Sequence, residues 1–349
     1  MNKNILITGG LGYIGSNTCL QIPEDYNNII IVDNLSNSDE SVLEKIKFLN
    51  NKKHRIIFYP VDLIDLDEIE NIFNIYKPYS VIHFAGLKSV NQSIKDPYCY
   101  YNTNLQSTLN LLKTMIKYNC KNLIFSSSAT VYGDNPSPMS ENDIIGNNIT
   151  SPYGNTKYIN EIILNDFCKS YSNLNVISLR YFNPIGADKS YLIGENPNDI
   201  PNNLMPYILK VAVNNNLKYN YGEIYNKLNI FGNTYDTKDG TCERDFIHVT
   251  DLASAHICAL NKIHNLKGYN AFNVGTGKPT SVLKLINTFI EVNKVNLPFI
   301  FVSKREGDIK CSYCDNSKIK KILGWQPKYD IKDMCIDSWN FQKKLIENK

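Results

Sequence analysis

The stretch Thr8-Gly9-Gly10-Leu11-Gly12-Tyr13-Ile14-Gly15 decides the fold of this chain. It follows an apolar run over 4–8 that predicts a strand, and it opens an amphipathic pattern over 12–21 that predicts a helix. Glycine at a strand–helix turn lets the backbone approach a pyrophosphate, whose negative charge then lies at the positive end of the helix. The glycines that we expect to do so are Gly9, Gly12 and Gly15.

A carboxylate follows the glycine turn at the sequence spacing that is typical of a dinucleotide-binding site. Asp33 stands eighteen residues after Gly15, at the end of the second predicted strand. A carboxylate there accepts hydrogen bonds from the adenosine ribose and repels a 2′-phosphate, which favours NAD over NADP. After the third and fourth predicted strands, we expect Asp62 and Leu63 to face the adenine and residues 84–88 to line the cofactor channel. Glycines alone would indicate only a tight turn, but here strand, glycines, helix, strand and carboxylate occur in order.

Composition excludes several other classes of protein. The chain has 349 residues, and its 43% hydrophobic residues suffice for a buried core. Its formal charge of +3 is too close to neutral for a broad nucleic-acid-binding surface. No apolar run approaches the ~18 residues of a membrane span, and the amino terminus resembles a strand more than a secretory signal. Nine unpatterned cysteines indicate reduced thiols and a cytoplasmic protein. Cys311 and Cys314 form a lone pair without further ligands nearby, so we expect no metal site.

Strands and helices alternate through the first half of the chain. The patterns predict strands over 4–8, 29–33, 55–61, 80–84, 122–126 and 175–181, and helices over 12–21, 40–50, 65–76, 97–119 and 153–172. This alternation predicts an α/β protein with a doubly wound parallel sheet of the Rossmann type. After Pro184 the pattern is irregular, with helices expected over 249–264, 280–293 and 330–347. We therefore predict an NAD-binding domain over 1–183 and a smaller mixed α/β substrate lobe over 184–349, from which some chain crosses back to the sheet.

Tyr153 and Lys157 form a candidate catalytic pair. Because they are four residues apart in the fifth predicted helix, they lie on one helical face. A phenol has a pKa near ~10, and an ammonium at ~4 Å favours its ionised form by about 4 kcal/mol at an effective dielectric of 20. We therefore expect Lys157 to lower the pKa of Tyr153 toward neutrality. Tyr153 can then accept a proton from a substrate hydroxyl as hydride leaves the same carbon.

Ser128 ends a serine run after the fifth predicted strand, at the edge where ligands of parallel sheets gather. Its hydroxyl can donate to the reacting oxygen or accept from it. The serine run and the spacing of Tyr153 and Lys157 each also have a simpler explanation. A serine run is typical of a polar loop, and Tyr-x-x-x-Lys arises by chance in a chain with 23 tyrosines. In combination with the glycine turn, they favour catalysis.

These residues together resemble the extended short-chain dehydrogenases/reductases. The glycine turn, Ser128, Tyr153 and Lys157 are the features that match. Within this family the chain is similar, nearly end to end, to the nucleotide-sugar epimerases. The matching stretches cover both predicted domains and are 8–15, 84–88, 125–133, 151–153, 180–184, 200–207, 244–251 and 305–308.

The resemblance implies an isomerase that interconverts UDP-glucose and UDP-galactose without net redox change. Hydride would pass from carbon 4 of the hexose to tightly held NAD and return to the opposite face of a 4-keto sugar. Tyr153 would act as base and then acid, Lys157 would hold the nicotinamide ribose, and Ser128 would bind the reacting oxygen. The expected NAD contacts are Gly9, Gly12, Tyr13, Ile14, Gly15, Asp33, Asn34, Asp62, Leu63, Phe84, Ala85, Gly86, Lys88, Asn104, Tyr153, Lys157 and Phe182.

The resemblance also implies where the UDP-sugar binds. Arginine offers forked donors to phosphate oxygens, whereas amides and a carboxylate suit uracil and ribose. For the two arginines the alternative is a surface salt bridge, with the adjacent Asp245 and Glu306 as partners. The expected contacts, besides Ser128, are Asn183, Asn203, Leu204, Arg244, Arg305 and Asp308.

Two features depart from the family pattern. The segment 214–229 is longer than usual, and its richness in Asn, Lys and Tyr predicts an exposed loop. Ser312 stands where bacterial relatives tend to carry a bulky Tyr and relatives of broader specificity a small residue. We hypothesise that Ser312 leaves space for a 2-acetamido group, so that UDP-N-acetylglucosamine and UDP-N-acetylgalactosamine are also accepted.

Three alternatives remain open. A nucleotide-sugar 4,6-dehydratase needs an acid pair beside the active-site hydroxyl, and residues 129–131 supply none. An ordinary reductase would use exchangeable NADH. A cofactor-bound regulator or scaffold would show no turnover, although the complete set of Ser128, Tyr153 and Lys157 argues against this alternative.

The resemblance further implies a homodimer through the helices at 97–119 and 153–172, with no nucleic-acid or membrane partner.

Overall fold

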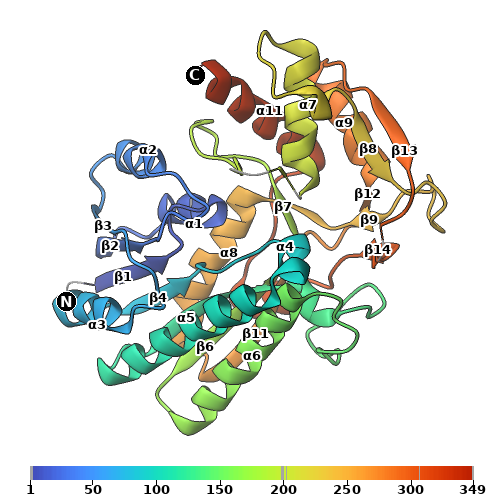
Figure 1. The fold of residues 1–349 in the computed structure, drawn as a ribbon. Coiled ribbons are helices and arrows are strands. Elements are labelled where there is room, and N and C mark those ends of the chain that lie inside the picture. The colour runs from blue at the N-terminus through green and yellow to red at the C-terminus, as the bar shows by residue number, and fades with distance from the viewer. Residues whose placement is uncertain (1–2, 198–199, 202, 306, 348–349) are drawn as a thin grey trace.

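A seven-stranded sheet forms the centre of the computed structural model, which describes residues 3–197, 200–201, 203–305 and 307–347 (Figure 1). All neighbouring strands in it are parallel, in the order β11-β6-β5-β4-β1-β2-β3. These strands are β1 (Lys3–Thr8), β2 (Tyr26–Val32), β3 (Arg55–Tyr59), β4 (Ser80–His83), β5 (Asn122–Ser128), β6 (Asn175–Tyr181) and β11 (Gly268–Val274). The predicted Rossmann-type sheet is thereby confirmed.

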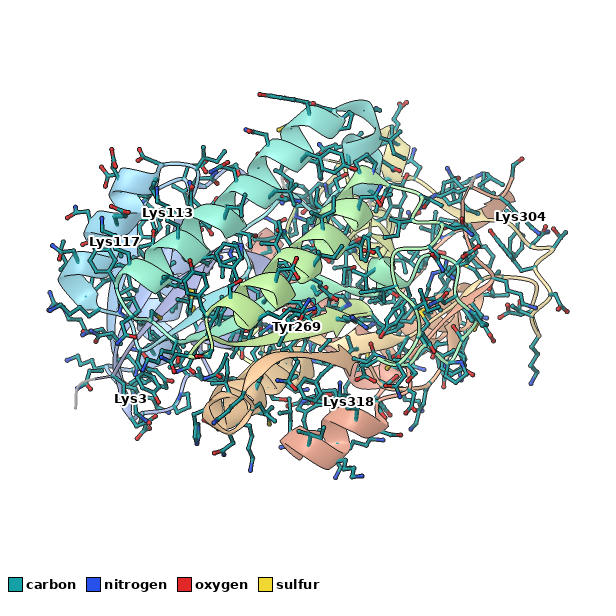
Figure 2. The ribbon with its side chains drawn as sticks, turned by 90° about the horizontal axis from the view of Figure 1, so that it is seen from below. Lys3, Lys113, Lys117, Tyr269, Lys304 and Lys318 are labelled. Atoms are coloured by element: carbon teal, nitrogen blue, oxygen red, sulfur yellow. The ribbon has the colours of Figure 1, made fainter. Side chains whose placement is uncertain are left out.

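Helices cover both faces of this sheet because successive strand residues point to opposite sides. Ile5 and Ile7 of β1 pack with α1 (Tyr13–Cys19), α2 (Ser41–Asn50), α8 (Val249–Lys262) and α10 (Ser317–Leu323). Leu6, between them, packs with the opposite layer, which consists of α3 (Leu66–Tyr76), α5 (Pro97–Lys117) and α6 (Pro152–Ser170). Figure 2 shows α5 and α6 side by side, with Lys113 and Lys117 of α5 on the outer surface.

The second lobe has its own apolar core. Its helices are α7 (Leu204–Asn216), α9 (Val282–Asn293) and α11 (Ile331–Glu347), which pack around the parallel pair β8 (Leu228–Phe231) and β13 (Phe299–Val302). Two further small sheets connect the lobes. They are the pair β7 (Asn183–Ile185) and β10 (Phe246–His248), and the mixed sheet of β12 (Thr280–Ser281), β9 (Glu243–Arg244) and β14 (Cys311–Ser312).

The six predicted strands and eight predicted helices are present, with ends shifted by a few residues. The predictions omitted β11, the strands of the small sheets (β7 to β10 and β12 to β14), the short helices α4 (Val90–Lys95) and α10, the 3₁₀ turns η1 (Ala129–Tyr132), η2 (Glu223–Tyr225) and η3 (Ile263–Asn265), and helix α7. Pro206 concealed α7 because a proline usually ends a helix. It lies in the first turn, where the backbone N–H has no helical partner and a proline is tolerated.

The segment 214–229 is only partly the exposed loop that its composition predicts. It contains the end of α7, then η2, and then the start of β8. Tyr225 and Leu228 are buried against the second core, so they anchor the segment at its far end. The outward-facing remainder supplies the exposed Asn and Lys residues that dominated the sequence pattern.

The first lobe contains segments from both halves of the sequence. Strand β11 and helix α8 come from the second half of the sequence, yet they complete the first sheet and its helical layer. The division of the chain into separate domains at residue 183 therefore stays a prediction. Among the described residues, no helix has the length and apolar character that crossing a lipid bilayer requires.

A buried polar cluster fastens α11 to β10 between the lobes. Asp337 on α11 accepts from Nε2 of His248 at 3.0 Å and pairs with Lys189 at 2.6 Å. The Thr250 N–H donates to Nδ1 of His248, so Nδ1 is an acceptor and the ring proton on Nε2 faces the carboxylate. Burial by itself would raise the pKa of Asp337, but these two partners together hold it below its usual range.

We expect Asp337→Ala to destabilise the protein by about 1–3 kcal/mol, because it leaves the buried His248 N–H without an acceptor. A folded-state pKa below the unfolded value of ~3.9 stabilises the protein above that pH and loses its effect as pH falls through the folded value. Urea unfolding at pH 7 and pH 3 measures both effects. Asp166→Ala, which breaks an exposed pair with Lys169, should change stability by less than about 0.5 kcal/mol. Equal effects of the two substitutions would contradict the role of Asp337.

Candidate active site

The glycine turn lies at the carboxyl end of β1, in the middle of the sheet. Gly9 has φ of +66° and donates its N–H to the Val32 carbonyl at 2.7 Å. A Cβ at Gly9 would lie 2.7 Å from the Ala85 nitrogen, and one at Gly15 would overlap the Gly9 carbonyl oxygen. Gly12 precedes α1 and leaves its end without a side-chain cap. The turn thus fits a dinucleotide diphosphate, with no side chain between the backbone and a ligand.

Asp33 is fixed beside this turn. Its carboxylate accepts from Leu11 N at 3.1 Å, Leu35 N at 3.0 Å and Ser38 Oγ at 2.8 Å. Because a carboxylate has about four acceptor positions, it retains capacity for a ribose hydroxyl. Asn34 donates to Asp62 at 2.8 Å, which links the ends of β2 and β3. The side chain of Leu63, in contrast, is buried in the core against α3 and α5.

The loop after β4 forms the next wall of the site. Asn104 on α5 accepts from Leu87 N at 2.8 Å and donates to the Leu87 carbonyl at 3.0 Å. It also donates to Oγ1 of Thr156 at 3.0 Å, which links this loop to α6. Gly86 has φ of +154° and approaches Asn104 closely. Asn104 therefore holds the loop after β4 in place through these hydrogen bonds. Its contact with NAD stays a prediction.

Ser128, Tyr153 and Lys157 meet at the carboxyl end of β5. Ser151 caps α6 by accepting from Gly154 N at 3.2 Å, which places Tyr153 in the first turn. The ammonium of Lys157 donates to the Ser126 carbonyl at 2.6 Å and lies 5.9 Å from the centre of the Tyr153 ring. The predicted grouping of the three side chains agrees with this geometry.

Burial governs the protonation of the pair. Burial raises the pKa of Tyr153, and the Ser128 hydroxyl offsets part of that rise. The expectation that Lys157 lowers the phenol pKa toward neutrality is therefore wrong for the protein alone, because burial of the phenol has the largest effect on its pKa and raises it. Burial also lowers the pKa of Lys157 to about 8, against the opposing charge of Glu161. Lys157 is therefore mainly protonated at pH 7.

A buried network beneath the pair was not predicted. Arg180 donates to Glu161 through two bonds, at 3.0 and 2.7 Å, and Ser127 donates to the same carboxylate at 2.6 Å. Arg180 also donates to the Tyr132 hydroxyl at 2.9 Å, which in turn donates to Asn273 of β11 at 2.7 Å. Glu161 could have been found, because it follows Lys157 by four residues on the same helix. Its partner on β6 has no local sequence signal.

The expected UDP contacts lie on the second lobe and at the lobe junction. Arg244 pairs with Asp308 at 3.5 Å and donates to the Ile309 carbonyl at 2.9 Å. The guanidinium of Arg305 stacks 3.8 Å from the centre of the Phe231 ring and has no ion pair with a described residue. Asp245 is buried against Thr276 instead of pairing with Arg244, and Glu306 lies outside the described residues. The salt-bridge alternative thus holds for Arg244 with Asp308 as a different partner, and for Arg305 it stays a prediction, because Glu306 lies outside the described residues.

The remaining predicted residues lie on several different elements. Asn183 follows β6 with an exposed side chain, whereas Phe182 is buried with Tyr132. Asn203 and Leu204 begin α7. Ser312 on β14 pairs with Arg244 on β9, so a small side chain lies next to one predicted phosphate ligand. The predictions missed Glu195, which contacts both Lys88 and Asn203 across the junction, and His256, which hydrogen-bonds Tyr181.

Comparison with known proteins identifies relatives over the full chain. Residues 5–275 match the model of the NAD dependent epimerase/dehydratase family. The chain is 44% identical to the UDP-glucose 4-epimerase of Bacillus subtilis over 343 residues, covering 98% of this chain and 97% of the relative. It is 45% identical to the UDP-glucose 4-epimerase of Dictyostelium discoideum over 344 residues, covering 98% and 96%.

Solved structures give the same result for the fold. A UDP-glucose-4-epimerase from Stenotrophomonas maltophila with bound NAD and formylated UDP-arabinopyranose superposes with a TM-score of 0.93, at 39% identity and 100% coverage of both chains. A UDP-glucose 4-epimerase from Bifidobacterium longum in complex with NAD+ and UDP gives 0.91, at 40% identity, covering 99% of this chain and 100% of that one.

The glycine turn can be tested without reference to turnover. Gly15→Ala should release most of the bound NAD and destabilise the protein by about 1–3 kcal/mol, because the new methyl group overlaps backbone that cannot move freely. Cofactor released on denaturation is quantified by absorbance, and stability by thermal unfolding. Ser16→Ala changes the next residue without adding volume and serves as the control. A Gly15→Ala protein that keeps stoichiometric NAD would refute this view of the turn.

Proposed function

The chain belongs to the NAD dependent epimerase/dehydratase family, and we propose that it interconverts UDP-glucose and UDP-galactose. The observation that carries the proposal is the meeting of Ser128, Tyr153 and Lys157 at the same edge of the sheet as the glycine turn. Bound NAD supplies a reversible hydride acceptor for carbon 4 of the hexose. The enzyme is accordingly an isomerase that needs no external reductant.

Tyr153 moves the proton in this scheme. Its phenol takes the proton of the 4-hydroxyl and later returns it to the 4-keto oxygen, so the residue ends each cycle in its starting state. Its raised pKa in the protein alone suits the acid half of that cycle. The Ser128 hydroxyl stabilises the phenolate in the base half as a hydrogen-bond donor, and the protonated Lys157, 5.9 Å from the centre of the Tyr153 ring, adds positive charge nearby.

The second lobe holds the UDP part of the substrate. Arg305 is suited to a phosphate because its guanidinium lies over the Phe231 ring, 3.8 Å from its centre, with no described carboxylate paired to it. Arg244 is held by two carbonyl oxygens and Asp308, which fixes its direction. Asn183, Asn203 and Leu204 then supply amide and backbone groups for the nucleotide.

The residues directly after Ser128 disfavour a 4,6-dehydratase. Residues 129–132 form η1, whose side chains are those of Ala, Thr, Val and Tyr. Val131 and Tyr132 are buried, and the Tyr132 hydroxyl already binds Arg180 and Asn273. No acid is therefore available there to protonate a leaving hydroxyl.

Further aspects of the proposal concern the setting of the enzyme. Helices α5 and α6 lie side by side on one surface, and they support a homodimer built on that face (Figure 2). All nine cysteines are unpaired, which fits a reducing, cytoplasmic compartment. The proposed substrates, UDP-glucose and UDP-galactose, place the reaction in galactose metabolism. We also propose that the predicted domains 1–183 and 184–349 depend on each other, because both line the site.

Tyr153→Phe tests the proposal directly. The variant should retain NAD and bind UDP-galactose, yet interconvert the two UDP-hexoses at least about 10²–10⁴-fold more slowly, because it lacks the proton-transfer group. Turnover is followed by NMR of the sugar, and binding by calorimetry. Tyr158→Phe, on the same helix, is the matched control and should keep its turnover. Unchanged turnover in Tyr153→Phe would overturn the assigned role.

Ser312 sets the breadth of substrates in the proposal. One relative in the solved structures, at 34% identity, is the UDP-Glc/GlcNAc 4-epimerase from Campylobacter jejuni, with a TM-score of 0.81 and coverage of 98% of this chain and 100% of that one. We expect the native protein to accept UDP-N-acetylgalactosamine. Ser312→Tyr should reduce that activity about 100-fold and spare UDP-galactose, whereas Ser312→Ala should retain both. The idea fails if the native protein never converts the acetylated sugar.

A further inference from the structure

Glu161 lies one helical turn beyond Lys157 on α6 and has no part in the proposed proton and hydride transfer. Because the two residues are four apart, their side chains lie on the same face of the helix. Both are buried, with exposed fractions of 3% for Glu161 and 6% for Lys157. No described carboxylate forms an ion pair with Lys157, whose ammonium donates to the Ser126 carbonyl. Glu161 therefore acts on Lys157 as a nearby charge and not through a direct bond.

Arg180 and Ser127 hold the carboxylate of Glu161 in one place. Arg180 on β6 donates to its two oxygens at 3.0 and 2.7 Å, and the Ser127 hydroxyl donates to Oε1 at 2.6 Å. A guanidinium stays protonated in proteins, and its two parallel donors match the two oxygens of an ionised carboxylate. The negative charge next to Lys157 is therefore fixed in position, unlike that of a carboxylate on the surface.

The bond to Ser127 also fixes the end of β5. Ser127 stands between Ser126, whose carbonyl accepts from Lys157, and Ser128, whose hydroxyl contacts Tyr153. Glu161 thus joins α6 to β5 at the residue that lies between the two contacts of the catalytic pair.

The surroundings of the Lys157 ammonium contain little other charge. Burial lowers its pKa to about 8, and the charge of Glu161 opposes that change. His83 on β4 is neutral, because burial lowers its pKa to about 3. Other described groups that face this part of α6 are Tyr153 on α6 itself, Tyr100 on α5, the exposed Lys95 on α4, Tyr132 in η1, Arg180 and Tyr181 on β6, and Tyr269 on β11. Glu161 is the only one of these groups with a negative charge at neutral pH.

We propose that Glu161 is a positioning residue for the catalytic pair, which keeps the Lys157 ammonium charged and in place beside Tyr153. Arg180 and Ser127 contribute to this role because they hold the carboxylate. The inference rests on the proposed function and deepens it, since a positive charge nearby is what favours the phenolate of Tyr153.

Titration of the Lys157 ammonium in the NAD-bound protein tests this role directly. Lysine labelled with ¹³C at Cε reports its protonation by NMR, and Lys157→Met identifies the signal. Glu161→Gln keeps an acceptor for Ser127 but removes the charge, so the midpoint of the Lys157 titration should move to lower pH by about one pH unit. Glu161→Asp keeps the charge and should restore the native midpoint.

Turnover of UDP-galactose should follow the same change. Because Lys157 then loses its proton at lower pH, Glu161→Gln should be about tenfold slower than the native protein at pH 8.5 and within about twofold of it at pH 6.5. Asp337→Asn, which removes a buried, ion-paired carboxylate between α11 and β10, is the matched control. It should lower stability without moving the Lys157 titration.

A second variant separates the effect of charge from that of stability, because Glu161→Gln leaves a buried Arg180 without its counterion. Combining Glu161→Gln with Arg180→Met removes both charges, and the Lys157 midpoint should again move to lower pH. A native midpoint in this double variant, or an equal loss of turnover at pH 6.5 and pH 8.5 in Glu161→Gln, would overturn the proposal. Failure of the proposed function is distinguishable, since it would appear as the expected shift of the Lys157 titration without interconversion of the UDP-hexoses.

Discussion

The hydrogen bond from the Lys157 ammonium to the Ser126 carbonyl, at 2.6 Å, is the contact on which the site depends. It fixes α6 against the end of β5, so that Tyr153 and Ser128 face the same space. Removing the ammonium from water is unfavourable, and its lowered pKa of about 8 expresses that penalty. The carbonyl oxygen and the charge of Glu161 offset part of it. A substituted Lys157 would therefore alter both the direction of α6 and the proton chemistry of Tyr153.

The charges around this bond form two layers with different tasks. Glu161 and Arg180 lie beneath Lys157 in a fully partnered network that reaches from α6 through β6 to β11. Strand β11 comes from the second half of the sequence, so the network ties distant chain segments to the catalytic pair. Above the sheet, in contrast, Arg305 and Lys88 retain donors for a ligand. The partnered charges thus stabilise the structure of the site, whereas the partly free charges are the ones that we propose contact the ligand.

Local sequence patterns predicted most of this architecture. The glycine turn, Asp33 and the i, i+4 spacing of Tyr153 and Lys157 are short-range features, and the structure places them as expected. Strand β11 and the contacts of Glu195 were missed because they depend on pairing between segments far apart in the chain. The predicted lowering of the Tyr153 pKa was wrong for another reason, since a sequence gives the spacing of charges but not how deeply they are buried. The position of Asp245, buried instead of paired with Arg244, has the same cause.

The central claim is that hydride leaves carbon 4 and returns to it within one binding event, while the chain supplies only proton transfer and positioning. UDP-galactose that carries deuterium at carbon 4 tests this most directly, with the purified protein and no added NAD. We expect the UDP-glucose that forms to retain the deuterium at carbon 4, as read by NMR, even when unlabelled NADH is added. Loss of the label to solvent, or its dilution by the added NADH, would contradict it.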